Sequence, residues 1–245
     1  MNSPIERLIK VKGEIVYLEV ELLTLCSHVR KFNNEIIHDL NKMNNNYMGL
    51  FNAIWKLSVI MDKIAYTYSR AILEKGNVFR WSNYARTDIE LFHIILRSSM
   101  DYVTKIISCF LPLNKTSFSI FRKDLNDHKD VVGKEIYELV SKADWYEEFN
   151  RIRNELIHGG SEITVYHQFE VGTCFSIGKF SSGDSEILVF EKYAVKYFSL
   201  YIDFLDQVGH ALRRMIVLDT PIAPLKLSGQ GLRVFRHWSM VGGNA

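Results

Sequence analysis

The chain has 245 residues, of which 47% are hydrophobic and 24% are charged. This composition is typical of a folded chain with a sizeable buried core, and it excludes disordered, collagen-like and disulfide-stapled proteins. Thirty basic and 28 acidic residues leave a formal net charge of +2. Charge alone therefore does not indicate a nucleic-acid binder, and any contact with a polyanion must be local.

The three cysteines, Cys26, Cys109 and Cys174, are odd in number and far apart in the sequence. This spacing offers neither a disulfide framework nor a zinc site and is typical of a reducing compartment. The charged N-terminal residues do not resemble a signal peptide, and the longest uncharged stretch, 43–55, is too short and too rich in Asn for a membrane span. We therefore expect a cytoplasmic protein that uses no metal or other cofactor and does not bind a membrane.

Two long helices are predicted in residues 1–76. The capping-box pattern Ser3-Pro4-Ile5-Glu6 begins the first, and apolar residues then recur at alternating steps of three and four up to Ile36. After an Asn-rich break at 44–46, the same rhythm runs from Tyr47 to Ala71. We expect a long antiparallel helical hairpin that packs as part of one domain. Packing of the same apolar stripes against a second chain would give an identical sequence pattern.

A helical core is predicted at 77–217. Its first helix runs from about Tyr84 to Phe110, and 112–128 form a polar connector in which Phe118, Ile120 and Phe121 must dock. The next helical region, 129–158, is broken near 142–144 and ends before Gly159-Gly160. The apolar stripe of the first core helix consists of Ile89, Phe92, Leu96, Met100, Val103 and Ile107.

The hydrophobic period then changes from helical to two. Alternation from Ile163 through His167 to Val171 predicts an antiparallel hairpin or a three-stranded sheet within 162–190, with a turn at 181–184 and His167 as an interior imidazole. A last helix is predicted at 193–217 and a loosely held tail at 218–245. The expected fold class is all-α, an antiparallel helical bundle with a small β-hairpin insertion.

The segment from Trp145 to Gly160 concentrates polar side chains, whereas the sequence lacks a phosphate-binding loop, a dinucleotide fingerprint, a nucleophile elbow and a zinc-peptidase motif. On an ideal helix, Arg151, Asn154 and His158 fall on one flank, and Arg153 falls on the other. Arg presents a planar fork of donors to phosphate oxygens, and His exchanges a proton near neutral pH. These residue types therefore indicate phosphodiester chemistry. The expected buried stripe of this helix consists of Trp145, Phe149, Ile152 and Leu156.

The stretch Arg153-Asn154-Glu155-Leu156-Ile157-His158 resembles the Arg-(x4–6)-His motif of HEPN domains, including the polar residue after the arginine. The resemblance covers roughly 84–217. It implies an HEPN-like all-α bundle that forms a homodimer, with the motifs of two protomers in one composite cleft. It further implies a metal-independent endoribonuclease with RNA as its substrate, and a toxin or defence effector with an antitoxin or other defence protein as its partner.

Carried over to this chain, the resemblance assigns Arg153 to the scissile phosphate and His158 to general base or acid catalysis during attack by the ribose 2′-hydroxyl. It assigns Asn154 to orienting one of these two groups. Arg151, with six residues between it and His158, also satisfies the spacing and is the better-placed arginine on a straight helix. The Arg-Asn dipeptide favours Arg153, which we predict, with Arg151 as the alternative.

Structural interpretations compete with these assignments. His158 suits the helix C-terminus electrostatically, and the two arginines can pair with Glu147, Glu148 or Glu155. The chain would then be a non-catalytic, HEPN-like dimerisation or ligand-binding module that regulates a partner protein. Arg97 and Asp101 are expected to form a structural pair across the bundle. The basic and aromatic segment 233–238 could stack on single-stranded RNA or dock on a partner.

Overall fold

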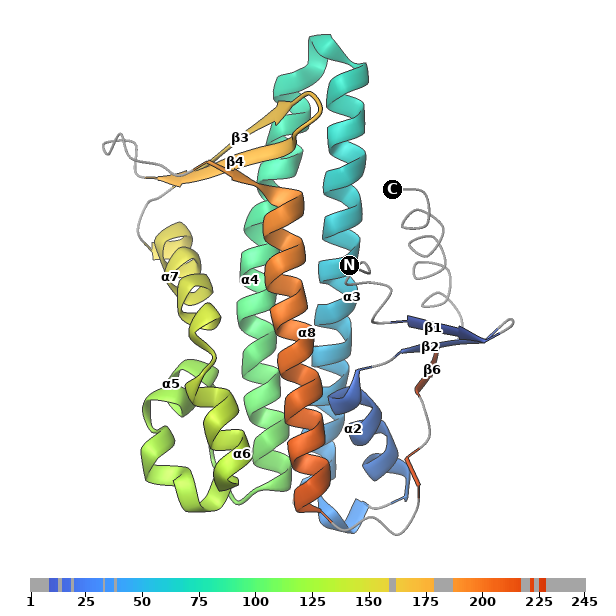
Figure 1. Ribbon diagram of the computed structural model, residues 1–245, viewed down its shortest axis with the longest axis vertical. Helices are drawn as coiled ribbons and strands as arrows, with labels where there is room; N and C mark the ends of the chain where they lie inside the picture. The colour runs from blue at the N-terminus through green and yellow to red at the C-terminus, as the bar shows by residue number, and fades with distance from the viewer. Residues whose placement is uncertain are drawn as a thin grey trace. The chain divides into compact units, whose positions relative to one another are not determined.

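The structure is a computed structural model that describes residues 9–12, 15–18, 20–32, 34–37, 39–158, 162–178, 187–216, 221–222 and 225–227. The chain is mostly helical, as predicted (Figure 1). The helices are α2 (Glu21–Phe32), α3 (Leu40–Leu73), α4 (Val78–Phe110), α5 (Phe118–Lys123), α6 (Lys129–Ser141), α7 (Asp144–His158) and α8 (Phe190–Met215). The strands are β1 (Ile9–Lys12), β2 (Ile15–Leu18), β3 (Glu162–Gln168), β4 (Gly172–Gly178), β5 (Leu188–Val189) and β6 (Leu225–Leu227). Among the described helices, none is long and apolar enough to cross a membrane.

The chain divides into two compact units, and the division does not follow the order of the sequence. The first unit consists of residues 1–51, 100–142 and 198–245. The second consists of residues 52–99 and 143–197. Helices α3, α4 and α8 each contribute residues to both units.

The first unit contains an antiparallel sheet in the order β1-β2-β6, with Ile9 opposite Leu18 and Leu18 opposite Leu225. The predicted first helix is therefore wrong at 9–12 and 15–18, which are strands. Steps of three and four between apolar residues do not separate helix from strand over so short a stretch, and the β-branched residues there favour strands. The tail prediction is wrong for 225–227, which form β6. The segment 233–238 and the predicted C-cap at 159–160 lie outside the described residues.

Of the predicted first helical arm, the described residues form the α-helix α2 and a short 3-10 helix at Asn34–Ile36. The predicted break at 44–46 is wrong, because these residues lie inside α3. α3 begins after Asp39, whose Oδ1 accepts the backbone N–H of Lys42 at 2.9 Å. Arg30 Nε donates to Asn44 Oδ1, and the Arg30 guanidinium lies 4.4 Å from the ring centroid of Tyr47. These contacts hold the Asn-rich turn within the helix.

The connector between α4 and α6 is partly helical. Phe118 and Phe121 of α5 are buried, whereas Ile120 is exposed. Asp101 has a structural role here, because its Oδ1 accepts the backbone N–H of Phe118 at 2.9 Å. The predicted break near 142–144 is confirmed by the end of α6 at Ser141 and the start of α7 at Asp144.

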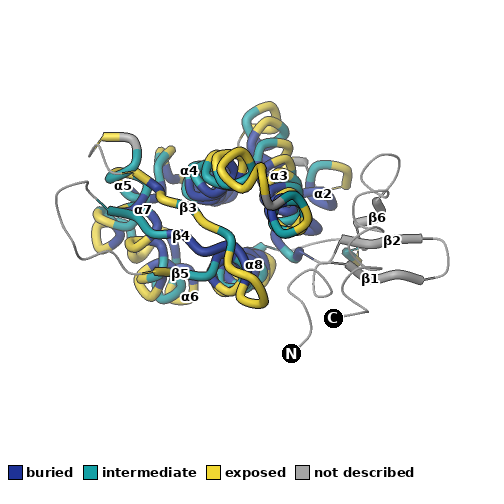
Figure 2. The backbone as a smooth tube through the Cα atoms, turned by 90° about the horizontal axis from the view of Figure 1, so that it is seen from above, coloured by how far each residue is buried: buried dark blue, intermediate teal, exposed yellow. Residues whose placement is uncertain are grey.

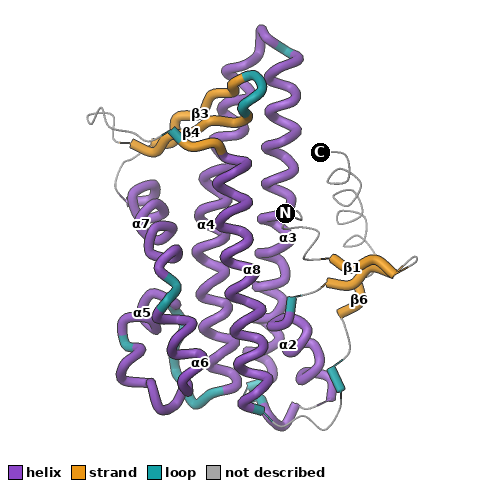
Figure 3. The backbone as a smooth tube through the Cα atoms, viewed as in Figure 1, coloured by secondary structure: helices purple, strands orange, loops and turns teal. Residues whose placement is uncertain are grey.

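The second unit carries the predicted three-stranded sheet, in the order β3-β4-β5. Strand β5 leads directly into α8 (Figure 3). β4 is largely buried, whereas much of β3 is exposed (Figure 2). The predicted alternation holds for Ile163, which is buried, and for His167, which is half-buried. It fails at Phe169 and Val171, which are exposed in the β3–β4 turn, because Glu170 adopts a φ of 62° and ends the strand. The turn predicted at 181–184 lies outside the described residues.

Candidate functional site

Helix α7 carries the candidate site in its last turns. Its buried face consists of Tyr146, Phe149 and Ile152, whereas Trp145 and Leu156 are only half-buried. The predicted stripe is therefore correct at its centre and wrong at its ends. Arg153 follows Phe149 by four residues, so it lies at the margin of the buried face rather than on a fully solvated flank.

An aromatic cluster in the second unit holds α7 in place. The ring of Phe149 lies 4.6 Å from Tyr197, 5.1 Å from His93 and 5.9 Å from Tyr193, measured between centroids. Such pairs contribute about 0.5–1.5 kcal/mol each beyond the burial of their surface. We define the cluster as Phe92, His93, Phe149, Phe175, Phe190, Tyr193 and Tyr197.

His93 is the polar centre of this aromatic cluster. It is fully buried, with Nδ1 at 2.8 Å from the carbonyl oxygen of Ile89 and Nε2 at 3.0 Å from the hydroxyl of Tyr193. The carbonyl can only accept, so Nδ1–H donates to it and Nε2 accepts from the tyrosine hydroxyl. Burial lowers the pKa of His93 to about 4, against the opposing effect of the Ile89 hydrogen bond. The imidazole is therefore neutral at pH 7.

Glu148 links the solvent side of α7 to the same cluster. Its Oε2 accepts the hydroxyl of Tyr197, and Lys196 Nζ lies 4.7 Å from the centroid of that ring. Burial raises the pKa of Tyr193, and the nearby Glu148 carboxylate raises it further. Tyr193 therefore remains a protonated hydrogen-bond donor.

Arg153, Asn154 and His158 come together at the end of α7. Arg153 Nη1 lies 3.0 Å from Asn154 Oδ1 and 3.4 Å from His158 Nε2. His158 and Asn154 are exposed, whereas Arg153 is half-buried. The Nε atom of Arg153 is enclosed and has no hydrogen-bond partner among the described residues. The guanidinium is thus held against the helix with one edge directed at the imidazole.

Arg151 does not join this group. Its Nη1 lies 2.7 Å from Glu155 Oε1. This ion pair is one that the structural interpretation of the arginines anticipates. The expectation that a straight helix brings Arg151 closer to His158 than Arg153 is wrong in this structure. That expectation followed the Cβ directions alone, whereas the long side chain of Arg153 reaches along the helix toward the imidazole.

The arrangement brings together a permanent cation and a titratable base. Arginine can only donate, so His158 Nε2 is the acceptor in this contact. An accepting imidazole nitrogen can remove a proton from a hydroxyl, and the adjacent guanidinium can neutralise an anion that forms nearby. The surface at 153–158 is therefore suited to acid–base chemistry beside a phosphate.

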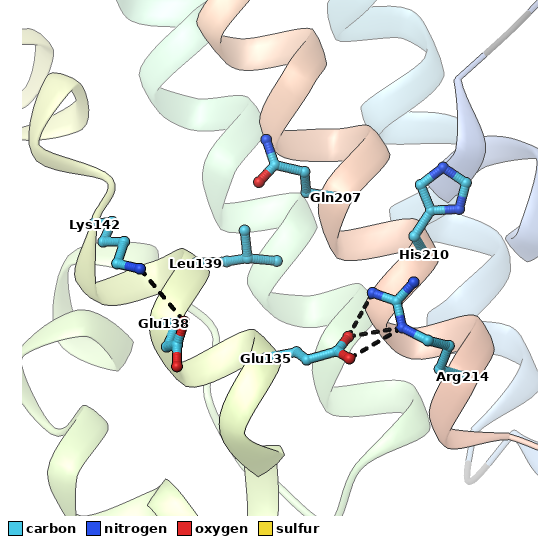
Figure 4. Close-up of a pocket in the computed structure, with 7 residues that line it drawn as sticks. All are labelled: Glu135, Glu138, Leu139, Lys142, Gln207, His210 and Arg214. Atoms are coloured by element: carbon cyan, nitrogen blue, oxygen red, sulfur yellow. Dashed lines mark hydrogen bonds and ion pairs between the residues drawn. The ribbon is translucent and has the colours of Figure 1, made fainter.

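The first unit has a hollow between α6 and α8 (Figure 4). Its charged side chains are already paired. Arg214 donates to Glu135 from Nε at 2.9 Å and from Nη2 at 2.5 Å, and this pairing raises the pKa of Arg214. Lys142 Nζ lies 3.3 Å from Glu138 Oε2. A site whose charges neutralise each other in pairs offers little attraction to a charged ligand.

The three cysteines are free and buried, and the described residues contain no group of three or more His, Cys, Asp or Glu side chains that could hold a metal ion. The pairing of His93 with Tyr193 could not be predicted from the sequence, because the two residues lie 100 positions apart and meet only in the folded chain. Comparison with known protein families, curated proteins and solved structures gives no match.

Proposed function

We propose that the end of α7 is the active site of a metal-independent endoribonuclease of the HEPN type. The observation that supports it is the approach of Arg153 Nη1 to 3.4 Å from the exposed His158 Nε2, with Asn154 bound to the same guanidinium nitrogen. These are the residues to which the motif assigns the chemistry. A role as a toxin or a defence effector follows from the same resemblance.

In this mechanism His158 Nε2 removes the proton of a ribose 2′-hydroxyl. The 2′-oxygen attacks the adjacent phosphorus, the bond from phosphorus to the 5′-oxygen breaks, and that oxygen takes a proton from water. The products are a 2′,3′-cyclic phosphate and a free 5′-hydroxyl. Arg153 neutralises the charge that develops on the non-bridging oxygens. Asn154 Oδ1 accepts from Arg153 Nη1 and restricts the guanidinium to the orientation that faces the phosphate.

The proposal includes a homodimer in which the ends of α7 from two copies share one cleft. A single Arg153–His158 pair gives the RNA one cation, whereas two copies give a local basic surface on a chain whose net charge is only +2. Light scattering on a sizing column checks this component, and the expected mass is twice the 28.5 kDa of the chain.

The direct test is cleavage of a 5′-labelled single-stranded RNA by the purified protein in excess EDTA. We expect His158→Ala to reduce the rate at least about 100-fold, since general acid–base catalysis contributes about 10²- to 10⁴-fold. Arg153→Ala should cause a loss of about 100-fold or more, because it removes charge stabilisation in the transition state. The products should carry a 2′,3′-cyclic phosphate.

Arg151→Ala is the matched control. It removes an arginine two positions away on the same helix, and that arginine pairs with Glu155 instead of His158. We expect its rate to stay within about two-fold of the unaltered protein. RNA that is not cleaved, or that is cleaved equally by His158→Ala, would contradict the proposed function. A substrate with 2′-deoxyribose throughout must also remain intact.

A further inference from the structure

The strand β3 lies at an edge of its sheet. It pairs with β4 along its whole length, from Glu162 opposite Gly178 to Gln168 opposite Gly172. In the part of the chain that the structure describes, β4 is its only strand neighbour. A strand in an antiparallel pair directs part of its backbone N–H and C=O groups away from its partner, so β3 offers hydrogen-bonding groups along its free edge.

Two hollows adjoin β3. The first, of about 350 Å³, is lined by Phe79 and Arg86 of α4 and by Ile163 and Val165 of β3, among others. The second, of about 380 Å³, is lined by Ala71 and Ile72 of α3 and by His167 and Phe169. Val78 lines both hollows, so they adjoin each other along the strand. We call the two hollows together the β3 groove.

Large apolar side chains around the β3 groove are exposed. Phe79 is 82% exposed, Leu73 74% and Phe169 67%. The turn between α3 and α4 extends past β3 on the side away from β4 (Figure 1). A strand added to β3 would therefore lie over the ends of these two helices, and its inward side chains would meet the exposed apolar residues there. A concentration of exposed apolar side chains of this kind is typical of a binding surface.

The spacing of the hollows matches an extended peptide. The first hollow is lined by 163–165 and the second by 167 and 169, so the centres of the two stretches are about four residues apart, or about 13 Å at 3.3 Å per residue. In a strand, side chains at positions i and i+4 point to the same face. Apolar side chains with this spacing would enter the two hollows together.

The charge of the β3 groove disfavours a nucleic acid. Arg86 is the only charged residue that lines either hollow in the described part of the chain. Its Nε lies 3.2 Å from Glu90 Oε1, and its Nη2 lies 3.7 Å from Glu162 Oε2. Binding of a phosphate backbone depends on basic side chains that can neutralise it. An apolar groove beside an edge strand suits a peptide better.

We propose that β3 binds an extended segment of a partner protein by strand addition, with apolar side chains at i and i+4 of that segment in the two hollows. This interaction goes beyond the ribonuclease activity and does not require it. Glu162 follows His158 by four residues, which span at most about 14 Å. One end of the bound segment would therefore lie within that reach, plus one strand spacing of about 5 Å, of the candidate active site.

A synthetic peptide tests the proposal on the full-length protein. The probe is a fluorescein-labelled peptide of nine residues, built from Ser, Thr and Lys, with Val at its third position and Phe at its seventh. We expect saturable binding by fluorescence anisotropy at micromolar to millimolar protein. Phe79→Ala should weaken it about ten-fold or more, since an exposed aromatic at the centre of an interface carries much of its affinity. Tyr66→Ala, which removes another exposed aromatic from outside the groove, should leave it unchanged.

Methylation of the peptide backbone separates strand addition from simple apolar contact. N-methyl groups at one set of alternate residues should abolish binding, whereas N-methyl groups at the other set should preserve it, because only one set faces β3. Absence of binding at millimolar concentration, or equal effects of both sets, would overturn the proposal. It would also be overturned if Phe79→Ala instead reduced the protein's mass in light scattering, or its affinity for a single-stranded RNA. Loss of RNA cleavage in His158→Ala leaves peptide binding intact, so the two proposals fail separately.

Discussion

Acidification should weaken the second unit through the protonation of His93. The folded protein lowers the pKa of this imidazole from about 6.5 to about 4 because the ring is buried among aromatic side chains. Between these two values the unfolded chain binds more protons than the folded chain, so protons favour unfolding there. The contribution of the neutral His93 to the free energy of unfolding is therefore complete above about pH 6.5 and is lost as the pH falls to 4. At about 1.4 kcal/mol per pH unit, the loss is about 3 kcal/mol.

The measurement is the free energy of unfolding in urea at a series of pH values from 7 to 4. The comparison protein carries His93→Phe together with Tyr193→Phe, which removes the titrating ring and its hydroxyl partner while keeping aromatic volume. Other groups titrate equally in both proteins, so the difference between the two curves isolates His93. We expect the unaltered protein to lose about 3 kcal/mol more than the double variant over this range. Parallel curves would refute the assignment of a neutral, buried imidazole.

Three further predictions concern the backbone. A Cβ at Gly209 would clash with the backbone nitrogen of Leu22, so Gly209→Ala should destabilise the protein by about 1–3 kcal/mol in urea unfolding. Gly76→Ala, which meets no atom within 4 Å, should change stability by less than about 0.5 kcal/mol. Glu170 has a φ of 62°, where a non-glycine residue is strained, so Glu170→Gly should stabilise by about 0.5–1 kcal/mol and raise the melting temperature. A lower melting temperature would contradict this.

Much of the helical core could be predicted from the sequence because burial follows helical periodicity there. The stripe from Ile89 to Ile107 on α4 is buried throughout, and the change to a period of two correctly indicates the sheet that begins near Glu162. The N-terminal strands were not predicted, because four-residue segments contain too few periods to distinguish a strand from a helix. Pairing of β2 with β6 joins residues more than 200 positions apart, which no local pattern reveals.

The sequence predicts the residues of the candidate site but not which arginine faces His158. The motif names Arg153 and His158 by their spacing, but spacing on an ideal helix favours Arg151 as the partner of the imidazole. The structure pairs Arg151 with Glu155 and directs Arg153 toward His158. The outcome depends on the full length and direction of each side chain and on the nearest carboxylate. The catalytic roles of Arg153, Asn154 and His158 stay predictions that the cleavage experiment tests.

Local sequence patterns are enough to locate the helices of the core, the concentration of polar residues on α7, and the chemistry that those residue types permit. These properties depend on neighbours within one or two helical turns. The folded chain was needed to show that His93 meets Tyr193, which arginine side chain of α7 reaches His158, and that β3 has no second strand neighbour among the described residues. Each of these depends on distances between residues remote in the chain or on side-chain reach, which packing sets and local periodicity does not encode.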